Sequence, residues 1–412
     1  MDHQKIVALS NLYLNRYAWP RHELRNKFVG NPDIIVVVPA HNEPNLAHSL
    51  AVLHNCTPPK GEVLIIVLIN ESVASSEEVL DNNINSFHKA TVLNKVYKQQ
   101  VLHLQLPPKK AGVGLARKIG MDEAVRIFEA QNKNGIIVCY DADCHCEPNY
   151  LIAIEDFYRH VNANLGLVHY EHKLHQVHHE AIVNYELYLR YYINALRVAS
   201  YPFAVQTLGS CITVRSFAYQ KQGGMNQRKA GEDFYFIHKV MPLGDIGEIN
   251  QTTIYPSDRL SDRVPFGTGH AVGKYLSAPN PDYPVYDYRI FEDLKFINEG
   301  VESLYHQKDL SKSIPESIAS FYSENSFSLD ELIKQSGSAT NFRDRYYQWW
   351  DGFQVLKFVH FARDNYYPQI PLSSALDWLD DQENGLRFKG KSREEQLLEL
   401  RTFDKAQNFY IK

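Results

Sequence analysis

The chain has 412 residues, of which 44% are hydrophobic and 22% are charged, and this length suits one large α/β domain with an appended region. Its formal net charge of −5 and the lack of long Lys/Arg runs exclude the basic surface of a nucleic-acid-binding protein. We therefore expect no nucleic-acid partner.

The expected elements begin with a helical lead-in over residues 1–32. The β-branched run Ile34–Val38 then indicates a strand buried on both faces, and a helix from about Asn45 to Leu53 leads to a second apolar strand at Val63–Ile69. The same alternation continues with a helix at 76–94, a strand at 101–106, a helix after the loop at 109–114 and a strand at 136–140. This order predicts an α/β fold with a doubly wound, mostly parallel sheet that binds ligands at the carboxyl ends of its strands.

In the second half of the chain, the expected strands and helices alternate less regularly. Its expected elements are strands at 166–170, 207–214 and 248–255, an amphipathic helix over 182–196, and a helix that opens at Gly231. A Pro-rich stretch at 279–284 indicates a boundary, and residues 290–412 are expected to be mainly helical. We therefore expect a lead-in at 1–32, an α/β domain at 33–278 that divides near residue 143, and a mainly helical region at 279–412.

No segment of the sequence predicts a membrane span. The longest apolar run near a strand, Val63–Ile69, is far shorter than the roughly 18 residues that a membrane helix needs. The N-terminus lacks the features of a signal peptide, and the five cysteines do not suggest a disulfide framework. We expect a cytoplasmic protein with reduced thiols, for which peripheral membrane contact stays open.

Two carboxylates follow the strand at 136–140, in the motif Asp141-Ala-Asp143. Residues i and i+2 of an extended chain point to the same side, so both carboxylates can reach one cation. Such a cation also offsets the repulsion between like charges. The alternative is an ordinary turn after a strand, because the motif by itself is short.

Four motifs in a fixed order resemble glycosyltransferase family 2. They are Val36-Val-Val-Pro39-Ala40-His41-Asn42-Glu43, then Gly112 with Ala116-Arg117 and Gly120, then Asp141-Ala-Asp143, then Gly231-Glu232-Asp233. The likeness covers roughly residues 33–275. It implies a GT-A fold with a nucleotide-sugar half up to about residue 143 and an acceptor half up to about 278. It also implies a nucleotide-diphospho-sugar donor, a saccharide or other hydroxyl acceptor, and Mn²⁺ or Mg²⁺ as cofactor.

By this resemblance, Asp141 and Asp143 hold the metal, with Asp143 as the more direct ligand and Asp141 leaning toward the ribose or the ion. Oxygen ligands suit Mg²⁺ and Mn²⁺, and the ion offsets charge on the departing diphosphate. Some GT-A enzymes take a further ligand from a downstream His, and His270 is the candidate here. His270 follows Arg259 and Arg263 in a loop that is expected to close over the nucleotide.

The resemblance also implies a set of donor-binding residues. These are Pro39, Ala40, Asn42, Glu43, Asn70, Lys110, Arg117 and Asp141. Glu43 is expected either to accept from a ribose hydroxyl or to serve as a carboxylate at the start of a helix. Asn70 departs from the family pattern, which often has Asp after the second strand, so the base contact lies either with Asn70 or with Glu71. Lys110 and Arg117 are expected to contact the diphosphate, whereas Lys118 replaces a common Asn.

Gly231-Glu232-Asp233 carries the expected acid–base chemistry. Family 2 enzymes mostly invert the anomeric centre in one displacement, which requires a carboxylate to take the proton of the acceptor hydroxyl. Asp233 is the candidate base, and Glu232 is expected to bind the acceptor or orient the base. The alternative is that both are ordinary acids in the first turn of a helix.

Two other functions stay open at this point. A nucleotidyltransferase also uses a doubly wound sheet with paired acids, although it makes or breaks a phosphoanhydride. The other alternative is a non-catalytic module that binds a sugar nucleotide or a glycan. The sequence does not name the sugar, the base, the acceptor or the oligomeric state.

Overall fold

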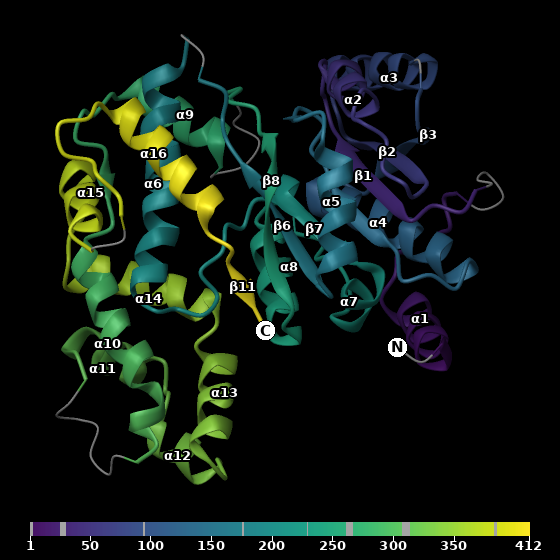
Figure 1. The fold of residues 1–412 in the computed structure, drawn as a ribbon. Coiled ribbons are helices and arrows are strands. Elements are labelled where there is room, and N and C mark those ends of the chain that lie inside the picture. Colours follow the sequence, from purple (N-terminus) through teal and green to yellow (C-terminus); the bar gives the residue numbers. More distant parts are fainter. Residues whose placement is uncertain are drawn as a thin grey trace. The chain divides into compact units, whose positions relative to one another are not determined.

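The computed structural model describes residues 3–24, 30–93, 95–174, 177–228, 230–260, 267–306, 314–382 and 385–412. Its contacts group the chain into two compact units. The first comprises Met1–Lys173, Thr207–Gly269 and Lys405–Lys412, and the second comprises Leu174–Gln206 and His270–Asp404. Figure 1 shows the elements of both units along the chain.

The first unit is built on a nine-stranded sheet with the order β11-β8-β6-β7-β4-β1-β2-β3, and β5 pairs with β8 (Figure 1). The strands are β1 (Ile34–Ala40), β2 (Val63–Ser72), β3 (Lys98–Leu106), β4 (Ile136–Cys139), β5 (His145–Cys146), β6 (Leu165–Tyr170), β7 (Ile212–Arg215), β8 (Ile246–Tyr255) and β11 (Tyr410–Ile411). Strands β3, β2, β1 and β4 are parallel, and β7 is antiparallel to both of its neighbours.

Burial on both faces explains why the first strands are so uniformly apolar. Every residue of β1 is buried, and β2 is buried from Val63 to Glu71. The register pairs Ile34 with Val63 of β2 on one side and with Ile136 of β4 on the other. Because helices cover both faces of a parallel sheet, alternation of polar and apolar residues is absent from such strands.

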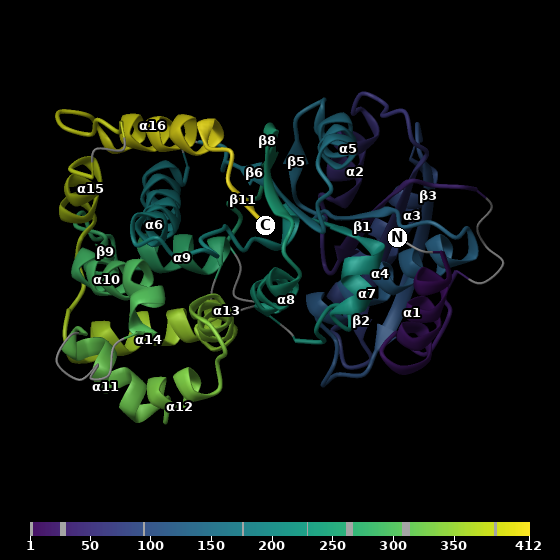
Figure 2. The ribbon, with the colours of Figure 1, turned by 60° about the horizontal axis from the view of Figure 1, so that its bottom comes forward.

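Two contact groups stand out among the helices of the first unit, and Figure 2 shows them with the bottom of the view of Figure 1 turned forward. They are α1 (His3–Arg16), α2 (Leu46–His54), α3 (Glu77–Val92), α4 (Val113–Ala130), α5 (Tyr150–His160), α7 (Ser216–Lys221) and α8 (Glu232–Val240), with short 3₁₀ turns at η1 (Gly209–Cys211) and η2 (Met241–Leu243). Helices α2 and α3 contact each other, whereas α4 contacts α1 and α7. Asp122 of α4 joins that second group because its Oδ1 accepts hydrogen bonds from Tyr13 over 2.5 Å and from Tyr219 over 2.8 Å.

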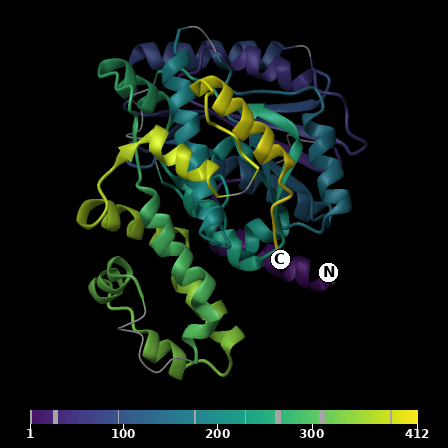
Figure 3. The ribbon, with the colours of Figure 1, turned by 60° about the vertical axis from the view of Figure 1, so that its left-hand side comes forward.

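The second unit is helical, as Figure 3 shows for its green and yellow segments. Its elements are α6 (His179–Val198), α9 (Thr268–Ser277, which begins in the first unit), α10 (Tyr288–Leu304), α11 (Glu316–Glu324), α12 (Leu329–Lys334), α13 (Ala339–Trp349), α14 (Gly352–Asn365), α15 (Leu372–Asp380) and α16 (Arg393–Ala406, which ends in the first unit), with a two-stranded ribbon of β9 (Pro284–Val285) and β10 (Ile370–Pro371). Its core contains Leu187 of α6 together with Trp350 and Phe358.

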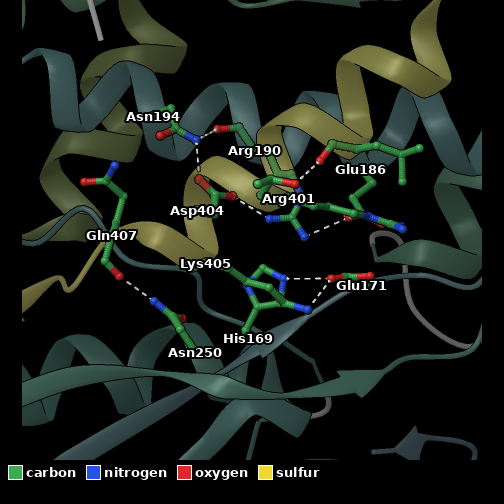
Figure 4. Close-up of polar contacts among 12 residues, drawn as sticks. His169, Glu171, Glu186, Arg190, Asn194, Asn250, Arg401, Asp404, Lys405 and Gln407 are labelled. Atoms are coloured by element: carbon green, nitrogen blue, oxygen red, sulfur yellow. Dashed lines mark hydrogen bonds and ion pairs between the residues drawn. The ribbon is translucent and has the colours of Figure 1, made fainter. Parts of the chain in front are cut away.

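Buried charges join α6 to α16 inside this second unit (Figure 4). Glu186 accepts from Arg190 over 2.9 Å and from Arg401 over 2.8 and 2.7 Å. Asp404 accepts from Arg190 and, over 2.9 Å, from Asn194. Paired and hydrogen-bonded in this way, the buried charges are compensated, and removing one partner would leave another uncompensated.

The last eight residues return to the sheet of the first unit. Lys405 Nζ lies 2.9 Å from Glu171 Oε1, and Asn250 donates to the carbonyl of Gln407 over 2.5 Å (Figure 4). Strand β11 then pairs antiparallel with β8. Sequence analysis did not predict β11, because a two-residue strand has no periodicity of its own.

The predicted α/β class is confirmed, with a doubly wound, mostly parallel sheet and a mainly helical C-terminal region. The three expected regions stay a prediction, and the contact units divide the chain differently: the lead-in at 1–32 groups with the sheet, and residues 270–278 group with the C-terminal helices. Helix α6 groups with the C-terminal helices, and residues 405–412 group with the sheet. Within the described ranges, no helix is long and apolar enough to cross a bilayer.

Candidate active site

The acidic pair lies directly after β4, at the carboxyl edge of the sheet. Tyr140 still bonds to β1 through its N–H to the carbonyl of Val37, and Cys144 N–H closes a turn on the carbonyl of Asp141 over 3.0 Å. The side chains of Asp141 and Asp143 are 35% and 31% exposed. Both carboxylates are therefore accessible to a ligand from solvent, as a metal or substrate site requires.

Arg117 of α4 links this pair to a second acidic group. Its guanidinium is buried and donates to Asp141 Oδ1 over 2.5 Å and to Glu232 Oε1. Burial by itself would lower the pKa of Arg117, but Asp141 and Glu232 outweigh it and raise that pKa above its ordinary value. Arg117 is therefore a permanently charged bridge between two carboxylates, and contact with a diphosphate stays a prediction.

Glycine at position 209 makes room for the bridge. A Cβ there would lie 2.8 Å from both terminal nitrogens of Arg117. Gly209 begins η1, directly before β7, and no motif in the sequence pointed to it. The sequence gives no local signal for the role of Gly209, because Gly209 and Arg117 are 92 positions apart.

Glu232 and Asp233 open α8, as the sequence predicts. Gly231 precedes them with a φ of 70°, a left-handed conformation that glycine adopts without strain. Burial raises the pKa of Glu232 despite the opposite effect of Arg117, and burial likewise raises the pKa of Asp233. Asp233 Oδ1 accepts from the N–H of Phe234 over 2.8 Å, and no other described side chain pairs with it. Glu232 is thus engaged by Arg117, whereas Asp233 keeps capacity for a proton.

Glu43 is buried at the carboxyl end of β1. Its Oε1 accepts from the N–H of Asn45, just before α2, and its Oε2 accepts from Arg259 over 2.6 Å. Arg259 also lies 3.7 Å from Asp143 Oδ2. The contact to Asn45 agrees with the alternative that Glu43 serves as a carboxylate at the start of a helix. Arg259, in the loop after β8, contacts the carboxylates of both Glu43 and Asp143. Arg263 lies outside the described residues.

Three more residues of the first motif, Pro39, Ala40 and Asn42, lie at the end of β1 or just after it. Pro39 and Ala40 are the last residues of β1. Asn42 has a φ of 49°, and its N–H donates to Asn83 Oδ1 over 2.8 Å, while its own Oδ1 accepts from Asn82 over 2.9 Å. Asn is among the residues that tolerate this conformation. Sequence analysis missed Asn82 and Asn83, which stand in an otherwise ordinary amphipathic helix.

Residues at the end of β2 are held from several sides. The carbonyl of Asn70 lies 2.8 Å from His41 Nδ1. Glu71 accepts from Asn83 over 3.1 Å and from Gln105 over 3.1 Å, and His103 Nε2 lies 2.9 Å away. Burial would raise the pKa of Glu71, but these hydrogen bonds outweigh it and lower the pKa. Glu71 therefore stabilises this edge, and a base contact from Asn70 stays a prediction.

Lys110 and Lys118 differ in burial. Lys110 is exposed in the turn after β3, where its N–H donates to the carbonyl of Pro107 over 2.8 Å. Lys118, in contrast, is buried and pairs with Asp122 over 3.1 Å. His270 lies in the first turn of α9 and belongs to the second unit, so its role as a metal ligand stays a prediction.

The carboxylates at this site suit a hard cation that takes its other ligands from substrate phosphates and water. Within the described ranges, no three His, Cys, Asp or Glu side chains gather into a ready-made metal cluster. Asp141 and Asp143 nevertheless offer half-exposed carboxylate oxygens. Mg²⁺ commonly binds through one or two carboxylates, with substrate phosphates and water completing its shell. The residues present therefore suit Mg²⁺ or Mn²⁺ in combination with a diphosphate.

Comparison with known proteins finds likeness only among solved structures, since no family model and no curated protein matches the chain. The chain is similar to TarS 1–349 of S. aureus in complex with UDP-GlcNAc, at 12% identity and a TM-score of 0.40, over 77% of this chain and 91% of that chain. The likeness concerns the fold. A second structure is the mannosyltransferase PcManGT of Pyrobaculum calidifontis with GDP-Man and Mn²⁺, at 13% identity and a TM-score of 0.34, over 98% and 94% of the two chains. A third is glucosyl-3-phosphoglycerate synthase of Mycobacterium tuberculosis with Mg²⁺ and UDP, at 15% identity and a TM-score of 0.36, over 67% and 83%.

Proposed function

We propose that this protein is a metal-dependent, inverting glycosyltransferase that moves a sugar from a nucleotide-diphosphate donor to a hydroxyl acceptor. The observation that carries the proposal is the Arg117 bridge between Asp141 and Glu232. It joins the acids expected at the leaving group to the Glu232-Asp233 pair expected at the acceptor. On this proposal, the bridge connects the leaving-group side of the reaction to the acceptor side.

Asp143 and Asp141 are the residues that would hold the cation. A bound Mg²⁺ or Mn²⁺ would offset the negative charge that develops on the departing diphosphate. The half-exposed position of both carboxylates supports this role, since substrate phosphates must share the ion with them. The hydrogen bond from Arg117 fixes the orientation of Asp141, which limits the reorganisation needed when the donor binds.

Asp233 is the proposed base. In the reaction, the acceptor oxygen attacks the anomeric carbon as the bond from that carbon to the diphosphate oxygen breaks, and the proton of the acceptor hydroxyl moves to Asp233. Burial raises the pKa of Asp233, which brings it nearer to the pH at which a general base works well. Glu232, held by Arg117, serves as a positioning residue next to it.

The test is a donor-cleavage assay with a panel of UDP-, GDP- and ADP-sugars in the presence of Mn²⁺. We expect release of the nucleoside diphosphate from at least one donor, and its loss in Asp143→Asn and Asp233→Asn. Asp156→Asn is the control, because Asp156 pairs with Arg159 on an exposed face of α5. Formation of a nucleoside triphosphate and a sugar 1-phosphate when pyrophosphate is added to the donor would instead support a nucleotidyltransferase, and binding without turnover would support a non-catalytic module.

A further inference from the structure

A cavity of about 460 Å³ opens where β2 and β3 end, within the first unit. One wall is the segment after α1, and the other is the end of β3 with the residue that follows β2. Its lining includes Trp19, Pro20, Arg21, Gln105, Pro107 and Pro108. The acids of the candidate active site are not among its lining residues. Its volume falls in the range of small-ligand pockets, which hold roughly 300–1,000 Å³.

Trp19 is fixed in place by partners on α4 and next to it in the chain. Its backbone N–H donates to Asp122 Oδ2 over 2.6 Å, and its carbonyl accepts from Arg126. The indole Nε1 donates to Glu23 Oε1 over 3.1 Å, which sets the orientation of the ring. The aromatic surface is therefore ordered before any ligand arrives, and less conformational freedom is lost on binding.

The chemistry of the walls combines an apolar face with a polar rim. Trp19 and the rings of Pro20, Pro107 and Pro108 supply rigid apolar surface. Arg21 and Gln105 are exposed at the rim, where they offer donors and an acceptor, and the Nε2 of Gln105 is already bound to Glu71. A nucleobase is usually recognised by fixed, desolvated hydrogen-bond donors and acceptors, whereas the side chains of Arg21 and Gln105 are long and exposed. A pyranose ring instead presents a C–H face for stacking and hydroxyls all round that both donate and accept.

We propose that the Trp19 cavity is a saccharide-binding subsite that stacks one hexopyranose ring on the indole of Trp19. This inference rests on the proposed function, because it assigns the bound ring to the acceptor of the transfer reaction. The acceptor is then a glycan. Strands β3, β2, β1 and β4 are parallel and end at the same edge of the sheet. Cys139 at the end of β4 is in register with Gln100 of β3, and β3 continues six residues further to Leu106. Three strand spacings across the sheet and about 20 Å along β3 give about 24 Å between the end of β3 and the end of β4. An acceptor of a few sugar units spans that distance.

The experiment uses intrinsic fluorescence of the full chain, titrated with methyl glycosides of glucose, mannose and N-acetylglucosamine and with their disaccharides, in the absence of any donor. The chain has four Trp, and the other three, Trp349, Trp350 and Trp378, belong to the second unit. We expect a saturable emission change with at least one glycoside, and its loss in Trp19→Phe. Trp349→Phe is the matched control, because Trp349 is also half-buried, and its titration should be unchanged.

A second variant measures affinity directly by calorimetry. Trp19→Ala removes the stacking surface and should weaken saccharide binding by on the order of tenfold. The melting temperature of each variant checks that the fold is retained. The subsite is wrong if no glycoside binds, if Trp19→Ala binds as tightly as the parent, or if uridine, guanosine or adenosine binds there in place of sugars. Failure of saccharide binding with intact donor cleavage would overturn the subsite alone, and saccharide binding without any donor cleavage would overturn only the proposed function.

Discussion

The guanidinium of Arg117 joins two carboxylates: its Nη2 donates to Asp141 Oδ1 over 2.5 Å, and its Nη1 donates to Glu232 Oε1. The three residues come from α4, the turn after β4 and the start of α8. Any displacement of Arg117 therefore disturbs both acidic groups at once. This relationship gives the first two predictions.

Replacing Arg117 with Met should destabilise the protein by about 3–5 kcal/mol, because it leaves two carboxylates without their buried partner. Urea-induced unfolding measures the change. Arg343→Met is the matched control, since Arg343 pairs with Glu302 on an exposed surface, and its loss should cost less than about 1 kcal/mol. Equal losses in the two variants would contradict the assignment of Arg117 as a buried bridge.

Gly209→Ala should reduce turnover, because the new Cβ would lie 2.8 Å from the terminal nitrogens of Arg117 and force the guanidinium to move. We expect a loss on the order of 10²-fold, as for other ångström-scale misplacements. Gly300→Ala provides the comparison: Gly300 lies within α10 with nothing near its added Cβ, and this change should stabilise the helix by about 0.5–1 kcal/mol. The prediction fails if donor cleavage by Gly209→Ala matches the parent.

As the pH falls, donor cleavage should be lost at a pH above 3.8, the ordinary pKa of an Asp side chain. Asp233 accepts a proton only when ionised, and burial raises its pKa, so it becomes protonated at a higher pH than an exposed Asp would. The measurement is kcat/KM against pH, with recovery of activity on return to neutral pH as the check for unfolding. An acidic limb centred at or below 3.8 would remove Asp233 from the role of base.

Asp143→Asn should weaken Mn²⁺-dependent binding of nucleoside diphosphate by at least about tenfold, since it removes a charged ligand from the ion. Thermal shift with UDP and with GDP, each titrated in the presence of Mn²⁺, reports the affinity. Asp156→Asn should leave the shift unchanged. A full Mn²⁺-dependent shift in Asp143→Asn would contradict the metal role of this residue.

The sequence by itself determined the order of strands and helices in the first half. The uninterrupted Ile and Val of residues 34–38 and 63–69 identify strands buried on both faces, and β1 and β2 include them. The same local signals placed Asp141 after a strand and Glu232 at the start of a helix. Such features depend on neighbouring residues, so periodicity and turn chemistry reveal them.

Only the tertiary structure decided how these groups meet. Arg117 and Glu232 are 115 positions apart, and no local signal in the sequence predicts their ion pair; the same holds for Arg259 and Glu43, which are 216 positions apart. Strand β11 is found only through its partner β8, and Gly209 is explained only by the side chain that lies over it. Contacts of this kind depend on strand order and packing, which bring distant segments together with no repeat in the sequence to record them.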